Sequence, residues 1–169
     1  MHFNFHVPGF GKIIIFGGEI DGFRQFNSLN IFEQVFPFFD ASKGANVFAL
    51  RKTLGNFDDD DMRIYLNTAL VDERKIESFL YLVAAMTDVA ESIDKIVSFY
   101  ALSNREKVFL ERLNQGVEWL QTFSEPEELS SREIYRYYQL TEDAGVGGCL
   151  LSLASDRTDG GSRVQKTLI

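Results

Sequence analysis

A periodic run of apolar residues between positions 72 and 102 constrains the fold more than any other feature of this sequence. Apolar side chains recur there every three to four residues for about eight turns, with charged residues between them. The apolar positions are Ile76, Phe79, Leu80, Val83, Met86, Ala90, Ile93, Val97 and Tyr100. This spacing lines up one face of an α-helix. We therefore predict a long amphipathic helix over about 72–102, the longest of the chain.

Three Ser-x-x-Glu motifs indicate further helix starts. In such a motif the serine hydroxyl can accept a hydrogen bond from a free amide of the first turn, and the glutamate can accept one from the serine amide. The three pairs are Ser103 with Glu106, Ser124 with Glu127, and Ser130 with Glu133. They predict helices that begin near residues 104, 125 and 131. Apolar spacing favours two more helices over 29–39 and 41–54, and a weaker one over 149–154.

The N-terminal residues have the pattern of a β-hairpin. Residues 2–7 alternate between apolar and polar side chains, and a β-branched run over 12–16 follows a turn that contains Pro8 and Gly9. A hairpin is marginally stable alone, so it must pack on other elements. We predict a mainly α (α+β) fold in which this hairpin packs on a bundle of five or six helices. The domain organisation we expect is a single domain, 1–169, with a hairpin region (1–25), a helical body (28–154) and a turn and C-terminal tail (155–169).

Composition and charge exclude several classes of protein. No apolar run is long enough to span a bilayer, and the opening residues lack the pattern of a signal peptide. One cysteine, Cys149, excludes an internal disulfide and fits a reducing compartment, so we expect a cytoplasmic protein. The net charge of −8 would repel nucleic acids and anionic membranes. We therefore predict no nucleic-acid binding and no membrane binding.

Acidic residues concentrate in the middle of the chain, most densely at Asp58, Asp59, Asp60 and Asp61. Successive side chains on a helix point about 100° apart, so these four carboxylates cannot converge on one ion. A calcium loop of the EF-hand type needs a glutamate at its twelfth position, where this chain has Ala69. Two interpretations stay open: the start of a helix in water, or an acidic patch that faces a partner. We predict neither a metal nor a cofactor.

Two further groups of residues are candidates for partner contact. Asp88, Glu91 and Asp94 lie on the predicted long helix, either as a solvated face or as a protein-binding face. Twelve of the sixteen phenylalanines lie in the first 57 residues, and Phe36, Phe38 and Phe39 are the densest group. Aromatic residues are common at the energetic centres of interfaces. By contrast, we interpret Cys149 as a buried, inert thiol among leucines, and the glycines between 145 and 148 as small residues that allow close helix packing.

The sequence therefore predicts an acidic binding protein and not an enzyme. Its partner would be a basic protein, which it would recognise and neutralise in the manner of an immunity protein, an antitoxin or an anti-defence inhibitor. The alternatives are a structural or adaptor subunit of a larger assembly, a chaperone for a secreted effector, and an enzyme whose active residues are scattered in sequence. Self-association stays open. The candidate contact residues are Asp58, Asp59, Asp60, Asp61, Asp88, Glu91, Asp94, Phe36, Phe38 and Phe39.

Overall fold

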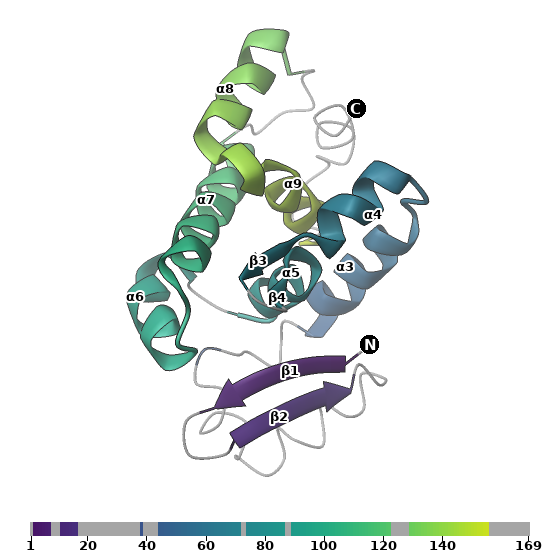
Figure 1. Cartoon of the computed structure of the whole chain (residues 1–169). Helices are drawn as coiled ribbons and strands as arrows, with labels where there is room; N and C mark the ends of the chain where they lie inside the picture. Colours follow the sequence, from purple (N-terminus) through teal and green to yellow (C-terminus); the bar gives the residue numbers. More distant parts are fainter. Residues whose placement is uncertain are drawn as a thin grey trace.

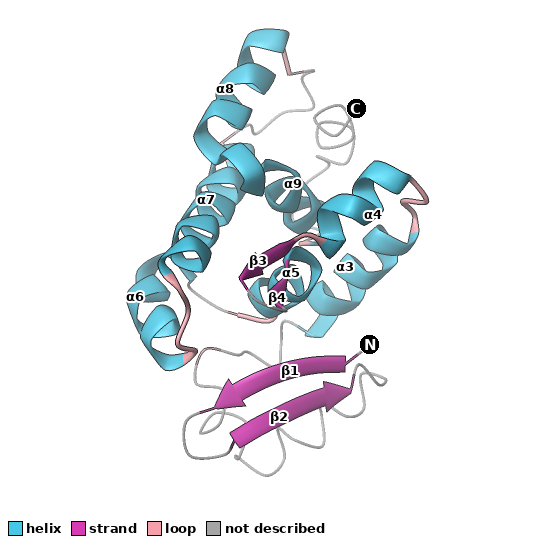
Figure 2. Ribbon diagram, in the orientation of Figure 1, coloured by secondary structure: helices cyan, strands magenta, loops and turns pink. Residues whose placement is uncertain are grey.

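The computed structural model describes residues 2–7, 11–16, 38, 44–71, 74–86, 89–122 and 129–155. Within these ranges the fold is mainly helical, as predicted (Figure 2). The helices are α3 (Gly44–Gly55), α4 (Asp60–Asn67), α5 (Ile76–Ala84), α6 (Val89–Phe99), α7 (Asn104–Gln121), α8 (Ser131–Thr141) and α9 (Gly145–Ala154). A 3-10 turn, η2 (Glu142–Ala144), joins α8 to α9. No helix of the described ranges is both long and apolar enough to cross a membrane.

The predicted N-terminal hairpin is confirmed. Strand β1 (His2–Val7) pairs antiparallel with β2 (Gly11–Phe16), so that His2 lies opposite Phe16 and Val7 opposite Gly11. A second, smaller antiparallel pair, β3 (Ala69–Val71) with β4 (Arg74–Lys75), connects α4 to α5. This pair was not predicted, because its residues fall at the edge of the long apolar repeat.

The prediction of one continuous helix over 72–102 is wrong. The described residues of that range form β4, α5 and α6 in succession, and the longest described helix is α7. The amide of Ala85 donates to the carbonyl of Leu82 at 3.2 Å, and that of Met86 donates to Val83 at 3.0 Å. These three-residue steps are the tighter turns typical of a helix end. A straight helix of that length would extend about 45 Å, beyond the width of a small domain, so the break lets both halves pack on one core.

Two of the three Ser-x-x-Glu motifs are confirmed as helix starts. At α7, Ser103 Oγ accepts from the Glu106 amide at 3.3 Å, and Glu106 Oε2 accepts from the Ser103 amide at 2.7 Å. Ser130 and Glu133 repeat this arrangement at the start of α8. The third motif lies within 123–128, outside the described residues. The predicted helix over 29–39 also lies outside them, except for Phe38, and so does the tail after residue 155.

Helices α5 and α9 form the centre of the core. Helix α9 packs against α7, α3, α5 and α8 (Figure 1), and its residues are buried on nearly every side. The apolar side chains that are almost fully buried come from all of these helices: Leu50, Leu80, Phe109, Leu110, Leu113, Tyr137 and Leu150. A helix that is apolar all round belongs in the interior. This explains why α9 carried only a weak amphipathic signal in the sequence.

Glycines bring α9 close to its neighbours, as the sequence predicted. A Cβ atom at Gly147 would lie 2.8 Å from Cδ2 of Leu113, and one at Gly148 would lie 3.6 Å from Cα of Gly116 on α7. The first distance is shorter than a normal contact, so no larger residue fits there without a shift. The second distance is an ordinary contact, and it shows that α7 and α9 approach closely at Gly116 and Gly148.

Candidate protein-binding surface

The four successive aspartates lie at the start of α4. Asp59 is the N-terminal cap of this helix, and its carboxylate accepts a hydrogen bond from the Met62 amide at 3.4 Å. Asp60 and Asp61 occupy the first turn, where negative charge interacts favourably with the helix dipole. The interpretation of this run as a helix start is thereby confirmed. A role in partner binding is compatible with it, because all four side chains are exposed to solvent.

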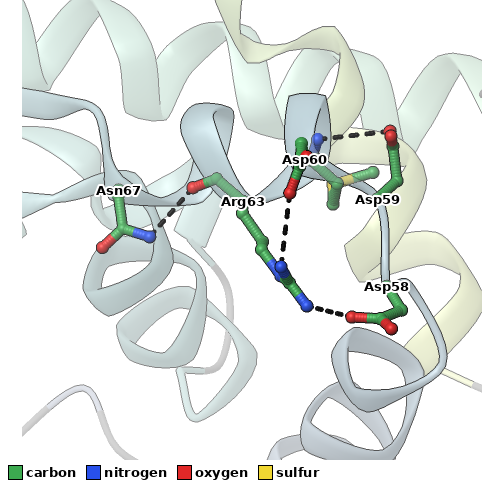
Figure 3. Close-up of polar contacts among 6 residues, drawn as sticks. Asp58, Asp59, Asp60, Arg63 and Asn67 are labelled. Atoms are coloured by element: carbon green, nitrogen blue, oxygen red, sulfur yellow. Dashed lines mark hydrogen bonds and ion pairs between the residues drawn. The ribbon is translucent and has the colours of Figure 1, made fainter.

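Arg63 neutralises part of this negative charge (Figure 3). Its guanidinium forms an ion pair with Asp58, and its Nη1 atom lies 3.3 Å from Oδ1 of Asp60. The aspartates are 88% and 90% exposed, so water competes for both contacts and each contributes little to stability. One arginine against four carboxylates leaves the start of α4 with a formal charge of −3.

Ile64 stands beside these acids and is exposed over 66% of its side chain. It follows Asp60 by four residues and Asp61 by three, which places all three on one side of the helix. Helix α4 is anchored to the core by Leu66 instead, its one buried residue. We call the exposed set Asp58, Asp60, Asp61 and Ile64 the α4 face. Ile64 was not among the predicted contact residues, because an isoleucine in a helix is usually a core residue.

The second predicted acidic group does not join the α4 face. Asp94 lies on α6, which is on the opposite side of the helical body from the start of α4 (Figure 1). Its carboxylate is paired with Nζ of Lys107 on α7 at 2.7 Å. Asp88 and the side chain of Glu91 lie outside the described residues. The two acidic groups, each predicted as a candidate for partner contact, are therefore not joined into one surface by the described residues.

Of the three candidate phenylalanines, only Phe38 lies in the described part of the chain, whereas Phe36 and Phe39 lie outside it. The ring of Phe38 is half-buried, and it packs against Phe99 and Tyr100 at the end of α6, with ring centroids 5.9 Å and 6.4 Å apart. This ring therefore contributes to the core and retains some exposed edge.

A set of polar contacts lies toward the interior, where α4, α8 and α9 meet. Tyr65 Oη donates to the Asp143 carbonyl and accepts from the Gly147 amide, both at 3.0 Å. Tyr137 Oη donates to the Gly145 carbonyl at 2.7 Å. Burial raises the pKa of both phenols, so they stay protonated and can act as donors at neutral pH. These contacts hold helices together rather than opening onto solvent.

Cys149 belongs to the same interior and is fully buried. Its Sγ lies 3.4 Å from Tyr137 Oη, and burial raises the pKa of the thiol to about 11. The thiolate is the reactive form of cysteine. The structure thus supports the interpretation of Cys149 as an inert thiol.

We expect Cys149 in the folded protein to resist thiol reagents at pH 8. A thiol with a pKa of about 11 is ionised in only about one molecule in a thousand at that pH, and the side chain has no access to solvent. The measurement is the rate of reaction with Ellman's reagent, with and without denaturant. Reaction of the native protein at the rate of the unfolded chain would contradict the buried placement.

Among the described residues, no group of three or more histidine, cysteine, aspartate or glutamate side chains could hold a metal ion. Comparisons with models of known protein families, with curated proteins and with solved structures find no match to this chain. The α4 face combines an exposed apolar side chain with acids that Arg63 compensates only in part, and we take it as the candidate site.

Proposed function

We propose that this protein binds a basic protein partner through the α4 face and neutralises that partner by covering its basic surface. The observation that supports this is the exposed Ile64, which lies beside carboxylates that Arg63 compensates only in part. Apolar side chains supply binding energy at the centre of an interface, and surrounding charges govern encounter rate and partner choice. The α4 face combines both properties on one helix start.

The charge of the whole chain favours the same class of partner. A net charge of −8 creates a negative field that attracts basic surfaces from a distance and repels acidic ones. An inhibitor of a basic toxin or nuclease needs this property, because it must reach its target rapidly. The proposal is thus a small acidic inhibitor that acts by occupying its target.

The first experiment identifies the partner. The tagged full-length chain is used for affinity purification from its native host at low and at high salt, and the co-eluting proteins are identified. We expect one basic protein that is recovered at low salt and depleted at high salt, since screening weakens attraction between exposed charges. Recovery of several neighbours that salt does not remove would instead favour a subunit of a larger assembly.

We expect Asp60→Asn combined with Asp61→Asn to slow association with that partner by about tenfold at low salt, because these carboxylates steer the encounter. Asp59 is left in place because it caps α4. The folded state should lose only about 1 kcal/mol, the scale of charge interactions with a helix dipole. Stopped-flow mixing or surface plasmon resonance measures the association rate, and urea unfolding measures stability.

The matched control is Glu111→Gln combined with Glu118→Gln on α7, which removes the same charge away from α4 (Figure 1). If the control slows association as much as the α4 variant does, then the total charge steers the encounter and the α4 face has no special role. A further variant, Ile64→Ser, is expected to accelerate dissociation rather than slow association, since its contact forms only in the complex.

A further inference from the structure

Helix α8 presents a second exposed face with the opposite charge. Its residues recur at helical spacing and are all exposed to solvent: Arg132, Tyr135, Arg136, Gln139 and Leu140. We call them the α8 face. Tyr135 is 63% exposed, and its Oη accepts a hydrogen bond from Nε2 of Gln139 at 2.9 Å. Arginine and tyrosine are among the residues that contribute most at protein interfaces.

The two arginines of the α8 face are unpaired within the described part of the chain. No ion pair joins Arg132 or Arg136 to a described acidic residue. The nearest acid in sequence, Glu133, uses its carboxylate to accept hydrogen bonds from the amide and hydroxyl of Ser130. These hydrogen bonds lower the pKa of the Glu133 carboxyl and Arg136 is close enough to help, yet neither guanidinium is held in an ion pair by an acid of the described residues.

The α4 and α8 faces are complementary to each other. Ile64 and Tyr135 are the two most exposed large apolar side chains of the described residues, at 66% and 63%. Ile64 stands among carboxylates, and Tyr135 stands among guanidinium groups. Within one molecule the two faces cannot meet, because the start of α4 and the outer side of α8 lie on separate parts of the helical body (Figure 1).

We propose that two copies of this chain associate head to tail, with the α8 face of one copy against the α4 face of the other. Arg132 and Arg136 would pair with Asp60 and Asp61, around an apolar contact between Tyr135 and Ile64. Such an interface uses two different patches, so the pair as a whole keeps one free α4 face and one free α8 face. Further copies can therefore add, as a closed ring or as an open chain depending on the rotation between neighbouring copies.

The negative charge of each copy opposes this association at long range, and salt screens that repulsion over about 8 Å at physiological ionic strength. Contacts within the interface are shorter and are screened less. Self-association is therefore expected to be weak and to be best observed near physiological salt. It would also cover the α4 face, so a basic partner would have to displace the neighbouring copy.

A charge-reversal experiment with complementation tests this proposal. One variant, Arg132→Glu with Arg136→Glu, reverses the α8 face and keeps the α4 face. The other, Asp60→Lys with Asp61→Lys, reverses the α4 face and keeps the α8 face. Each variant alone lacks one half of the interface, whereas an equimolar mixture contains one intact pair of faces. Sedimentation velocity as a function of concentration reports the oligomers of each sample.

We expect the unmodified protein to form concentration-dependent oligomers, and each variant alone to associate about a hundredfold more weakly, because like charges then face each other. The mixture should recover oligomers, because every contact between unlike variants brings opposite charges together: the intact α4 face meets the intact α8 face, and the two reversed faces are also opposite in charge. The control, Lys52→Glu with Lys95→Glu, reverses two exposed cations on α3 and α6 and should leave association unchanged.

Three results would overturn the proposal: an unmodified protein that stays monomeric up to about 1 mM, variants that associate like the unmodified chain, or a mixture that associates no better than either variant alone. Because Asp60→Lys and Asp61→Lys alter the first turn of α4, Ile64→Ser provides a second variant that keeps the charges. The proposal does not depend on the proposed function. If the chain is monomeric and still binds a basic partner, head-to-tail association is excluded and the proposed function is not.

Discussion

Replacement of Glu106 with alanine is expected to destabilise the folded protein by about 1–3 kcal/mol. The same replacement at Glu133 is expected to cost only a small fraction of that free energy. Both residues occupy the same position of a Ser-x-x-Glu capping box, at the starts of α7 and α8. They differ in burial, since Glu106 is fully buried whereas Glu133 is partly exposed.

Glu106 satisfies three groups at once. Its Oε2 atom accepts from the amide and the hydroxyl of Ser103 at 2.7 and 2.8 Å, and its Oε1 atom lies 2.8 Å from Nε of Arg74 on β4. The contact with Arg74 is ionic rather than an aligned hydrogen bond. Alanine would remove the acceptor of the Ser103 amide and leave that amide unpaired in a partly buried site, which costs about 1–3 kcal/mol, while the Ser103 hydroxyl could still cap the helix. Arg74 is 40% exposed and can return to water.

Urea unfolding of Glu106→Ala and Glu133→Ala measures this difference directly. Glu133 makes the same hydrogen bonds to Ser130, but water can replace them when its side chain is removed. A third variant, Glu106→Gln, keeps the volume and one acceptor and should fall between the two. If both variants lose the same free energy of unfolding, then the ion pair and the burial of Glu106 contribute no stability beyond that of an exposed capping box.

These two capping boxes also show what the sequence could predict. The helix starts at residues 104 and 131 follow from hydrogen bonds between residues three apart, so local sequence is sufficient to locate them. The burial of Glu106 depends on Arg74, which arrives from another element through the β3–β4 pair. Nothing in either motif distinguishes the buried carboxylate from the exposed one, because burial is decided by long-range packing.

Long-range packing also explains why the break in the helix predicted over 72–102 was not foreseen. The apolar repeat of this range is a local pattern, and it correctly indicates helical structure for α5 and α6. Periodicity does not report where a chain must turn to keep both halves on one core. The turn after Ala84 contains no proline or glycine before Val89 that would have predicted it.

The candidate surface was predicted in part. The helix start at Asp59 to Asp61 follows from the preference of acids for caps and first turns. The compensation by Arg63 could have been read from its position within five residues of Asp58. Two features could not be predicted: the exposure of Ile64, and the separation of Asp94 from the α4 face. Both depend on which side of α4 and α6 the core contacts.

The contact between Gly148 and Tyr137 supplies the second large expected effect. We expect Gly148→Ala to destabilise the protein by about 2–3 kcal/mol, although alanine is the better helix former by about 1 kcal/mol. A Cβ atom at Gly148 would lie 2.7 Å from Tyr137 Oη, which is buried and donates to the Gly145 carbonyl at 2.7 Å. The phenol cannot move away without the loss of that hydrogen bond, worth about 1 kcal/mol.

The matched control is Gly55→Ala at the end of α3, where an added Cβ would meet no atom within 4 Å. There the gain in helix propensity is unopposed, so the change should be neutral or stabilising by up to about 1 kcal/mol. Thermal or urea unfolding of both variants measures the two changes. If Gly55→Ala destabilises the protein as much as Gly148→Ala does, then the lost conformational freedom of glycine, rather than a steric clash, explains both changes.

A double-mutant cycle separates the clash from every other effect of Gly148→Ala. Tyr137→Phe removes the atom that the new methyl group would meet, at the cost of one hydrogen bond to Gly145. If the clash is with Tyr137 Oη, Gly148→Ala should be nearly neutral in the Tyr137→Phe background, which is a coupling of about 2 kcal/mol. The backbone of Gly116 would lie 3.6 Å from the methyl group, an ordinary contact, so nothing else nearby forbids alanine. If the stability losses of the two single variants simply add in the double mutant, then Tyr137 Oη does not clash with the methyl group, and α7, α8 and α9 pack differently at this crossing.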